Sequence, residues 1–364
     1  MTRSRFLSLS MLATLAFVIA ASSFPAHAQR VPASHTIIKF NVSGAGTGSG
    51  QGTIPFGIVA DGSILGEYID SSNVYHGFLR SAAGVITAFD APGAGPGQST
   101  FPGGINSALV IVGTYMDSSG VAHGFLRSPS GTFKTIDAPG AGTASGQGTG
   151  ASDINTKGEI AGSYTDSNGT THGYVRSPGG RFTSFDAPGA GTGPGLGTFP
   201  AGLCGLTDAG AVAGDSSDTS NVYQVFLRTP AGVLTTITPS GSVDTLIAGL
   251  SSNETVAGTY IDSTSIHGFV SLNGAITTFD APNSIGTSAN NITPGGTIVG
   301  DYYDTNSVFH GYVRTPTGAF IEFSVPGAGT GADQGTVAAY INSTGQITGN
   351  YIDSSGVSHG FLRQ

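Results

Sequence analysis

The stretch His123-Gly124-Phe125-Leu126-Arg127 is one copy of a phrase that returns along almost the whole chain of 364 residues. The other copies begin at His76, His172, Gln224, His267, His310 and His359. Successive copies start 47, 49, 52, 43, 43 and 49 residues apart. A period of this length is typical of propellers and solenoids, so the repeat decides the fold class before any other feature does.

One period contains four short segments with the composition of β-strands. Between residues 101 and 138 we expect strands at 101–106, 110–117, 121–128 and 132–138. Ser, Gly and Pro fill the turns at 118–120 and 129–131, as in β-hairpins. Four antiparallel strands in succession fit one propeller blade, and no segment keeps a helical period over three turns.

Both ends of the chain favour a closed ring. The last repeat stops at Gln364 after its third strand, while residues 36–42 read like a fourth strand followed by a Gly-rich loop. The sequence therefore predicts an all-β, seven-bladed β-propeller of four-stranded antiparallel blades, closed by pairing the N-terminal strand with the C-terminal blade. An open β-solenoid, which would need distinct capping repeats, and a sandwich are the alternatives.

The first residues have the pattern of an export signal. Arg3 and Arg5 precede a mostly apolar, uncharged run at residues 6–21, and Ala26-His27-Ala28 is a small-x-small cleavage site. We expect a signal peptide at 1–28 with the cut before Gln29, one domain at 29–364, and a periplasmic or extracellular location. No later stretch approaches the ~20 apolar residues of a membrane span, so none is expected.

Charge and cysteine content narrow the classes of partner. Removing Arg3 and Arg5 from 13 basic residues leaves 11 against 22 acidic ones. We expect no nucleic-acid partner, because such binding depends on Lys and Arg at phosphates. Cys204 is the one cysteine, so no internal disulfide can form, and we expect a small buried side chain there. We also expect a monomer.

The repeat resembles the bacterial extracellular HAF repeat family, named for a His-Ala-Phe core. Here the core reads His-Gly-Phe or His-Gly-Tyr, and it follows phrases of the form Ile-Asn-x-x-Gly-x-Ile-x-Gly at 154–162 and 341–349. The match covers nearly all of the chain after the signal, but it departs in having Gly for Ala and no Trp. The resemblance implies an exported, β-propeller-like repeat protein and supplies no catalytic residues.

Two sets of polar residues recur with the repeat. Six repeats keep the histidine: His76, His123, His172, His267, His310 and His359. All seven carry an aspartate at the preceding turn: Asp70, Asp117, Asp166, Asp218, Asp262, Asp304 and Asp353. These carboxylates could bind Ca²⁺ or a cationic ligand. Repetition favours the other interpretation, a turn aspartate bonded to the histidine across each hairpin, and no cofactor is expected.

Function is expected where the repeat breaks. In the fourth repeat Gln224 and Val225 replace His-Gly, Ser216 replaces Tyr, and Cys204 falls in the expected first strand. After the recurring Gly of the second strand, acids occur only at Glu67, Asp215 and Asp301. With Gln224, these acids would line a ligand site if they pointed into the channel. The alternative is neutral substitution at positions that tolerate many residue types.

Three functions remain open on the sequence alone. The first is an exported, non-enzymatic binding or interaction module for a protein, glycan or small molecule. The second is a hydrolase or lyase, which requires at least two of the three acids to meet at one point near the channel mouth. The third is a structural protein of the cell surface. The sequence contains no motif that identifies a ligand, because a fold alone does not determine function.

Overall fold

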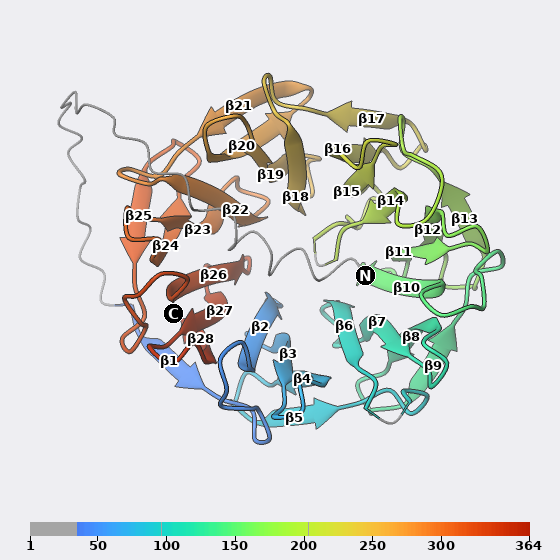
Figure 1. The fold of residues 1–364 in the computed structure, drawn as a ribbon, viewed down its shortest axis with the longest axis horizontal. Helices are drawn as coiled ribbons and strands as arrows, with labels where there is room; N and C mark the ends of the chain where they lie inside the picture. The colour runs from blue at the N-terminus through green and yellow to red at the C-terminus, as the bar shows by residue number, and fades with distance from the viewer. Residues whose placement is uncertain (1–34, 96, 203) are drawn as a thin grey trace.

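A computed structural model describes residues 35–95, 97–202 and 204–364, so the signal peptide expected at 1–28 lies outside the described residues. The described residues form 28 strands and no helix (Figure 1). In that part of the chain there is consequently no helix long and apolar enough to cross a membrane. The expected all-β fold with repeated four-stranded units is confirmed.

Consecutive strands pair antiparallel in groups of four, which we call blades and name by their first strand. The β2 blade contains β2 (Gly52–Ile58), β3 (Ile64–Ile69), β4 (Tyr75–Arg80) and β5 (Ile86–Phe89). The β6 blade contains β6 (Thr100–Ile105), β7 (Ile111–Met116), β8 (Ala122–Arg127) and β9 (Phe133–Ile136). The β10 blade contains β10 (Gly148–Ile154), β11 (Ile160–Thr165), β12 (Thr171–Arg176) and β13 (Phe182–Phe185).

The later blades repeat this order. The β14 blade contains β14 (Gly197–Pro200), β15 (Val212–Ser217), β16 (Tyr223–Arg228) and β17 (Leu234–Ile237). The β18 blade contains β18 (Asp244–Leu250), β19 (Val256–Ile261), β20 (Ile266–Leu272) and β21 (Ala275–Phe279). The β22 blade contains β22 (Gly286–Ile292), β23 (Ile298–Tyr303), β24 (Phe309–Arg314) and β25 (Phe320–Phe323). The β26 blade contains β26 (Gly335–Ile341), β27 (Ile347–Ile352) and β28 (Ser358–Arg363), with β1 (Ile37–Phe40) as its fourth strand.

The first strand of the chain completes the last blade. Ile37 pairs with Arg363 and Phe40 with Gly360, antiparallel, so the first and last described strands share one sheet. The expected pairing of the N-terminal strand with the C-terminal blade is confirmed. Figure 1 shows the resulting ring, with the first strand of each blade nearest the axis.

Neighbouring blades also touch through single parallel contacts, which join the strands into sheets of 12, 12 and 4. One such contact pairs Gly148 with Ala122, and another pairs Gly52 with Ser358. Both glycines have positive φ, and a Cβ at either would lie 2.0 Å from the partner's carbonyl oxygen. Glycine at the start of these strands is therefore required for the blades to approach this closely.

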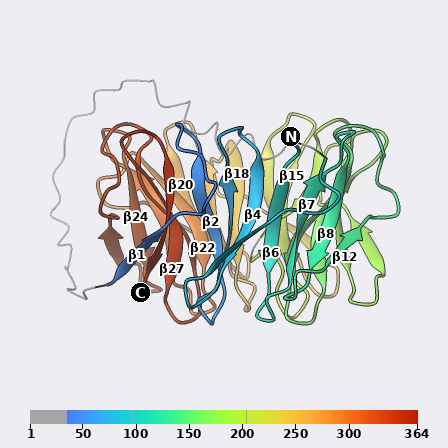
Figure 2. The ribbon, with the colours of Figure 1, turned by 90° about the horizontal axis from the view of Figure 1, so that it is seen from below.

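The strands run nearly along the short axis of the ring, so the connections gather on two faces (Figure 2). The hairpins between second and third strands and the Gly-rich links between blades form one face, which we call the loop face. The links and these hairpins touch, as when Gly46 N–H donates to the Ile69 carbonyl at 2.8 Å. The opposite face, which we call the hairpin face, holds the turns between first and second and between third and fourth strands.

Each apolar cluster belongs to two neighbouring blades. Leu65 and Phe89 of the β2 blade pack with Ile105, Ile111 and Phe125 of the β6 blade, all at most 8% exposed. Further clusters join other neighbouring blades in the same way, so burial of apolar surface between blades stabilises the ring.

Threonines in the first strands link neighbouring blades through buried hydrogen bonds. Thr198 Oγ1 accepts from Ala187 N–H of the preceding blade at 2.9 Å, and the same bond recurs at Thr53, Thr100, Thr149, Thr287 and Thr336. Thr245 is the exception, because the residue in the place of Ala187 is Pro239, which has no N–H. Thr245 Oγ1 is buried without a partner among the described residues.

The arginine of the repeated phrase stacks on the neighbouring blade. The Arg127 guanidinium lies 4.8 Å from the Phe89 ring centre, and Arg80, Arg228, Arg314 and Arg363 make the same contact with the preceding blade. The β9 strand ends in Ile136 instead of Phe, and there Arg176 stacks on Phe182 of its own blade. The β17 strand also ends in isoleucine, at Ile237, and in the next blade Ser271 replaces the arginine.

Thr245, whose hydroxyl has no partner in the described part of the chain, serves as a reference for the contribution of the inter-blade hydrogen bond to stability. We expect Thr198→Val to lower the free energy of unfolding by about 1–2 kcal/mol, because Ala187 N–H loses its acceptor in a buried place. Thr245→Val should cost nothing or stabilise, since its hydroxyl has no partner to lose. Urea unfolding of both variants measures the difference, and equal losses would contradict the assignment.

Removal of the first strand tests ring closure. A chain lacking residues 36–42 should lose about 3 kcal/mol or more of unfolding free energy, because half-buried Ile37 and Ile38 leave their clusters and β28 gains a free edge. Thermal unfolding followed by circular dichroism reports the loss. The control chain starts at Thr36, and identical melting of the two would refute closure.

Candidate functional site

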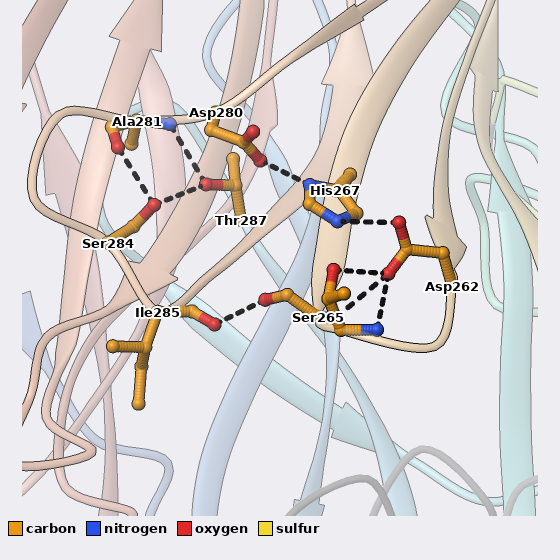
Figure 3. A network of polar contacts seen from close by, with 9 residues as sticks. Asp262, Ser265, His267, Asp280, Ala281, Ser284, Ile285 and Thr287 are labelled. Atoms are coloured by element: carbon orange, nitrogen blue, oxygen red, sulfur yellow. Dashed lines mark hydrogen bonds and ion pairs between the residues drawn. The ribbon is translucent and has the colours of Figure 1, made fainter. Parts of the chain in front are cut away.

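The repeated histidines bridge two strands and a turn on the loop face. In the β2 blade His76 Nδ1 lies 2.9 Å from Asp90 Oδ1, and His76 Nε2 lies 3.5 Å from Asp70 Oδ2. The same pair of contacts recurs at His123, His172 and His267. Figure 3 shows the copy in the β18 blade, with His267 between Asp262 and Asp280.

Two blades replace the second carboxylate with a neutral partner. His310 Nδ1 lies 3.3 Å from Ser324 Oγ, and His359 Nδ1 lies 3.0 Å from Asn41 Oδ1 of the N-terminal segment. Both keep the turn aspartate, Asp304 or Asp353, within 3.3 Å of Nε2. In all six blades that keep the histidine, Nε2 lies 3.0–3.7 Å from the turn aspartate, and the histidine side chains are 17–28% exposed.

A tyrosine stacks on each of these imidazoles. Tyr68 and His76 have ring centres 4.7 Å apart, and the other five pairs lie between 4.9 and 5.2 Å. In the β14 blade the tyrosine and the histidine are replaced together, by Ser216 and Gln224, and Ser216 Oγ donates to the Gln224 carbonyl at 3.4 Å. The stack is therefore missing at Gln224, while Asp218 keeps its turn contacts.

The turn aspartates use their oxygens within the hairpin. Asp70 Oδ1 accepts from Ser72 N–H at 2.8 Å and Val74 N–H at 2.9 Å, and the other six turns repeat this pattern. Chiefly the Val74 N–H, and with it His76, holds the pKa of the Asp70 carboxyl below its usual range. The described residues contain no group of three His, Cys, Asp or Glu arranged to hold a metal ion.

The three second-strand acids lie in separate blades, none of which is adjacent to another. Asp215 of β15 accepts from Ile247 N–H of the β18 blade at 2.8 Å. Asp301 of β23 accepts from Asn290 Nδ2, whose amide also donates to the Ala338 carbonyl of the β26 blade. Glu67 is buried in β3. Asp215 and Asp301 are each committed to contacts at their own blade interface, so the structure does not bring the three acids together.

Burial changes the acidity of two of these groups. Desolvation raises the pKa of Asp301 to about 7, opposed by the Asn290 amide. Desolvation also raises the pKa of Asp215 to about 8, opposed by the Ile247 N–H and increased by nearby Asp244. Both shifts follow from packing against the next blade, because a charged carboxylate is disfavoured where water is excluded.

A further buried acid was not found from the sequence. Asp153 in β10 is 4% exposed, and its Oδ2 accepts from Gly205 N–H at 3.1 Å and Leu206 N–H at 3.0 Å. Desolvation raises its pKa to about 7 against these donors. In the sequence, Asp153 stands out only because it occupies the first-strand position at which three other blades have Gly57, Gly104 or Gly249.

Asp153 holds an irregular segment of the β14 blade. Cys204 was expected in a strand, but β14 ends at Pro200 and Cys204 has a φ of +68°, which a strand does not allow. The Cys204 carbonyl accepts from Leu250 N–H of the β18 blade at 2.7 Å. Burial, and then Asp153, raise the pKa of the Cys204 thiol to about 12, so it is no thiolate nucleophile at neutral pH.

Hollows occur on both faces of the described part of the chain. One, of about 420 Å³, is on the loop face and is lined by Asp166, Asn168, Thr170, His172, Thr192 and Gly193. The other, of about 450 Å³, is on the hairpin face between the β22 and β26 blades. Neither contains Glu67, Asp215, Asp301 or Gln224.

Comparison with known proteins supports the fold. No protein-family model and no curated protein matches the sequence. Among solved structures, virginiamycin B lyase from Staphylococcus aureus is similar with 13% identity and a TM-score of 0.58, over 91% of this chain and all of that chain. A streptogramin B lyase is similar with 17% identity and a TM-score of 0.55, over 90% of this chain and 97% of that one.

A third similar structure is the β-propeller domain of the Trilobed protease from Pyrococcus furiosus. It has 8% identity and a TM-score of 0.52, over 87% of this chain and 95% of that chain. At these identities the likeness concerns the fold alone, and it agrees with the ring of four-stranded blades in Figure 1.

The raised pKa of Asp301 predicts that its contribution to stability falls as pH rises. Between pH 4 and 7 the folded chain keeps a proton on Asp301 that the unfolded chain has released, so this carboxyl group stabilises the fold less at the higher pH. Asp301→Asn should remove this pH-dependent contribution. The unfolding free energy of the variant should therefore rise relative to that of the native chain by on the order of 1 kcal/mol for each pH unit in that window.

Urea unfolding at pH 5 and pH 7 measures this dependence. The control is Asp333→Asn, the same substitution at an exposed aspartate of a link loop. Parallel profiles for Asp301→Asn and the native chain would contradict the argument.

Proposed function

We propose that the chain is an exported β-propeller protein that acts as a binding or interaction module and catalyses no reaction. The proposal includes a single domain at 29–364, seven four-stranded blades in one closed ring, and a periplasmic or extracellular monomer. Its ligand is a protein, a glycan or a small molecule. The pairing of β1 with β28 supports the closed ring, and the acidic composition disfavours a nucleic-acid ligand.

One observation favours a binding role rather than a catalytic one. The polar residues that recur are engaged with one another inside each blade, and the acids outside the repeat are separated in different blade interfaces. General acid–base catalysis needs its groups within reach of one substrate atom. The three second-strand acids therefore do not form the catalytic group that the hydrolase or lyase alternative requires. Two proteins of similar fold are nevertheless named lyases.

The resemblance to HAF repeats belongs to the same proposal. It rests on the His-Gly-Phe core, whose glycine has a physical role here. A Cβ on Gly77 would lie 2.3 Å from the Phe89 ring, so the small residue lets the fourth strand pack its aromatic side chain. The phrase is thus a packing motif, consistent with a repeat family that supplies no catalytic residues.

A ligand screen tests the proposed function. The mature chain, beginning at Gln29, is screened by thermal shift against glycans and small molecules and by array against envelope proteins. We expect at least one ligand to raise the melting temperature and to be recovered chemically unchanged by mass spectrometry. Conversion of that ligand would establish an enzyme, and the absence of any ligand would contradict the binding role.

A further inference from the structure

The hollow on the hairpin face combines an apolar wall with a buried cation. Ile321 of the β22 blade and Ile341 of the β26 blade form the partly exposed apolar wall. Arg363 and His35 are the ionisable residues that line it, and no Asp or Glu does. That is unusual in a chain with 22 acidic residues against 13 basic ones.

Arg363 lacks the hydrogen bond that several of its counterparts make. Arg80, Arg176 and Arg228 each donate to the carbonyl of the following residue at 3.4–3.5 Å. Among the described residues, Arg127 and Arg314 also make no such bond and keep buried nitrogens without a partner, but neither of them lines this hollow. Arg363 is 6% exposed and stacks on Phe323 at 4.8 Å, and its guanidinium makes no hydrogen bond within the described part of the chain. The stacked ring covers one face of the guanidinium, and its in-plane N–H groups remain available to an acceptor.

A glycine in the adjoining hairpin leaves the groove beside Arg363 open. Gly345 occupies the hairpin position that Leu109 occupies in the β6 blade, and both have positive φ. Leu109 and Leu79 both pack against the apolar cluster between the β2 and β6 blades, so a leucine at this turn position reaches across the blade interface there. A Cβ at Gly345 would meet nothing within 4 Å, so the turn glycine leaves the space beside Arg363 uncovered.

Ile321 gives this groove an apolar wall that most of its counterparts lack. It pairs with Val313 across the last two strands of the β22 blade. The residues at the same register of five other blades are polar: Thr87, Lys134, Thr183, Thr235 and Thr277. Ile38 is the remaining counterpart, and the next hairpin there has Gly62, whose Cβ would lie 3.1 Å from the Gln346 side chain. An apolar wall beside an uncovered turn glycine thus marks the hollow at Arg363.

We propose that this hollow binds a small organic anion, with a carboxylate on Arg363 and an apolar body against Ile321 and Ile341. A buried guanidinium without an acceptor favours a carboxylate, which can accept two parallel N–H bonds. The apolar wall favours a hydrocarbon or aromatic body over a sugar or an inorganic ion. This inference rests on the proposed binding function and specifies the ligand class of one site.

Direct titration tests the ligand class. Octanoate and phenylacetate are titrated into the mature protein by calorimetry, with octanamide and phenylacetamide as neutral counterparts. We expect the carboxylates to bind at least about tenfold more tightly than the amides, because hydrogen bonds to a charged group exceed those to a neutral one. Equal binding of acid and amide would overturn the proposal.

Two variants locate the site. Arg363→Gln should weaken octanoate binding at least about tenfold, whereas Arg176→Gln, in a blade away from the hollow, should leave it unchanged. Gly345→Leu should abolish binding because a leucine there covers the space beside Arg363, and Gly158→Leu, at the same hairpin position of the β10 blade, is its control for backbone strain.

The outcomes separate this inference from the proposed function. Binding of octanoate that survives both Arg363→Gln and Gly345→Leu would overturn the site, and so would the absence of carboxylate binding to the native chain. If the wider screen still finds another ligand, the binding module stands while the anion site fails. If neither experiment finds a ligand, both fail.

Discussion

The pairing of β1 with β28 is the constraint on which the rest of the structure depends. Each blade buries its faces only against its two neighbours, so a ring open at one place would leave two blades with an exposed apolar side. Closure through residues from opposite ends of the chain removes that exposed side and gives every blade two neighbours. Closure also places β1 beside the β2 blade. Phe40 of β1 then stacks on Arg80, as the aromatic ring of the preceding repeat does in other blades.

Replacements inside the chain show which residues act as units. The tyrosine and the histidine disappear together in the β14 blade, at Ser216 and Gln224, since neither has a role in the stack without the other. Pro239 leaves Thr245 without its donor, and Ile237 coincides with the loss of the next arginine at Ser271. Such pairs of changes are expected of residues that support each other across a blade or a blade interface, and they identify most of the conspicuous His, Asp and Arg positions as parts of the framework.

The sequence was sufficient for the strands and the order of the blades, because both follow from local patterns that recur. The four strands expected between residues 101 and 138 match β6 to β9 within two residues at each end. Contacts between blades were not predictable in the same way. Whether Asp215 and Asp301 face the channel or the next blade depends on the tilt of one sheet against another, and their contacts lie at the interface with the next blade. The role of Asp153 escaped prediction because its partners, Gly205 and Leu206, lie beside Cys204 in a segment of the next blade that departs from the repeat after β14 ends.

A ring built of nearly identical blades can differ functionally only where a single blade departs from the others without a compensating change. At Gln224 the departure is compensated by Ser216 and by Val225, which is buried against Ile237, so the framework is restored and no opening results. At Ile321 nothing compensates, because the isoleucine stands where most blades have Thr or Lys and the turn glycine opposite, Gly345, leaves it uncovered. The uncompensated position is therefore the stronger candidate for function, although the break in the repeated phrase at Gln224 is far more conspicuous in the sequence.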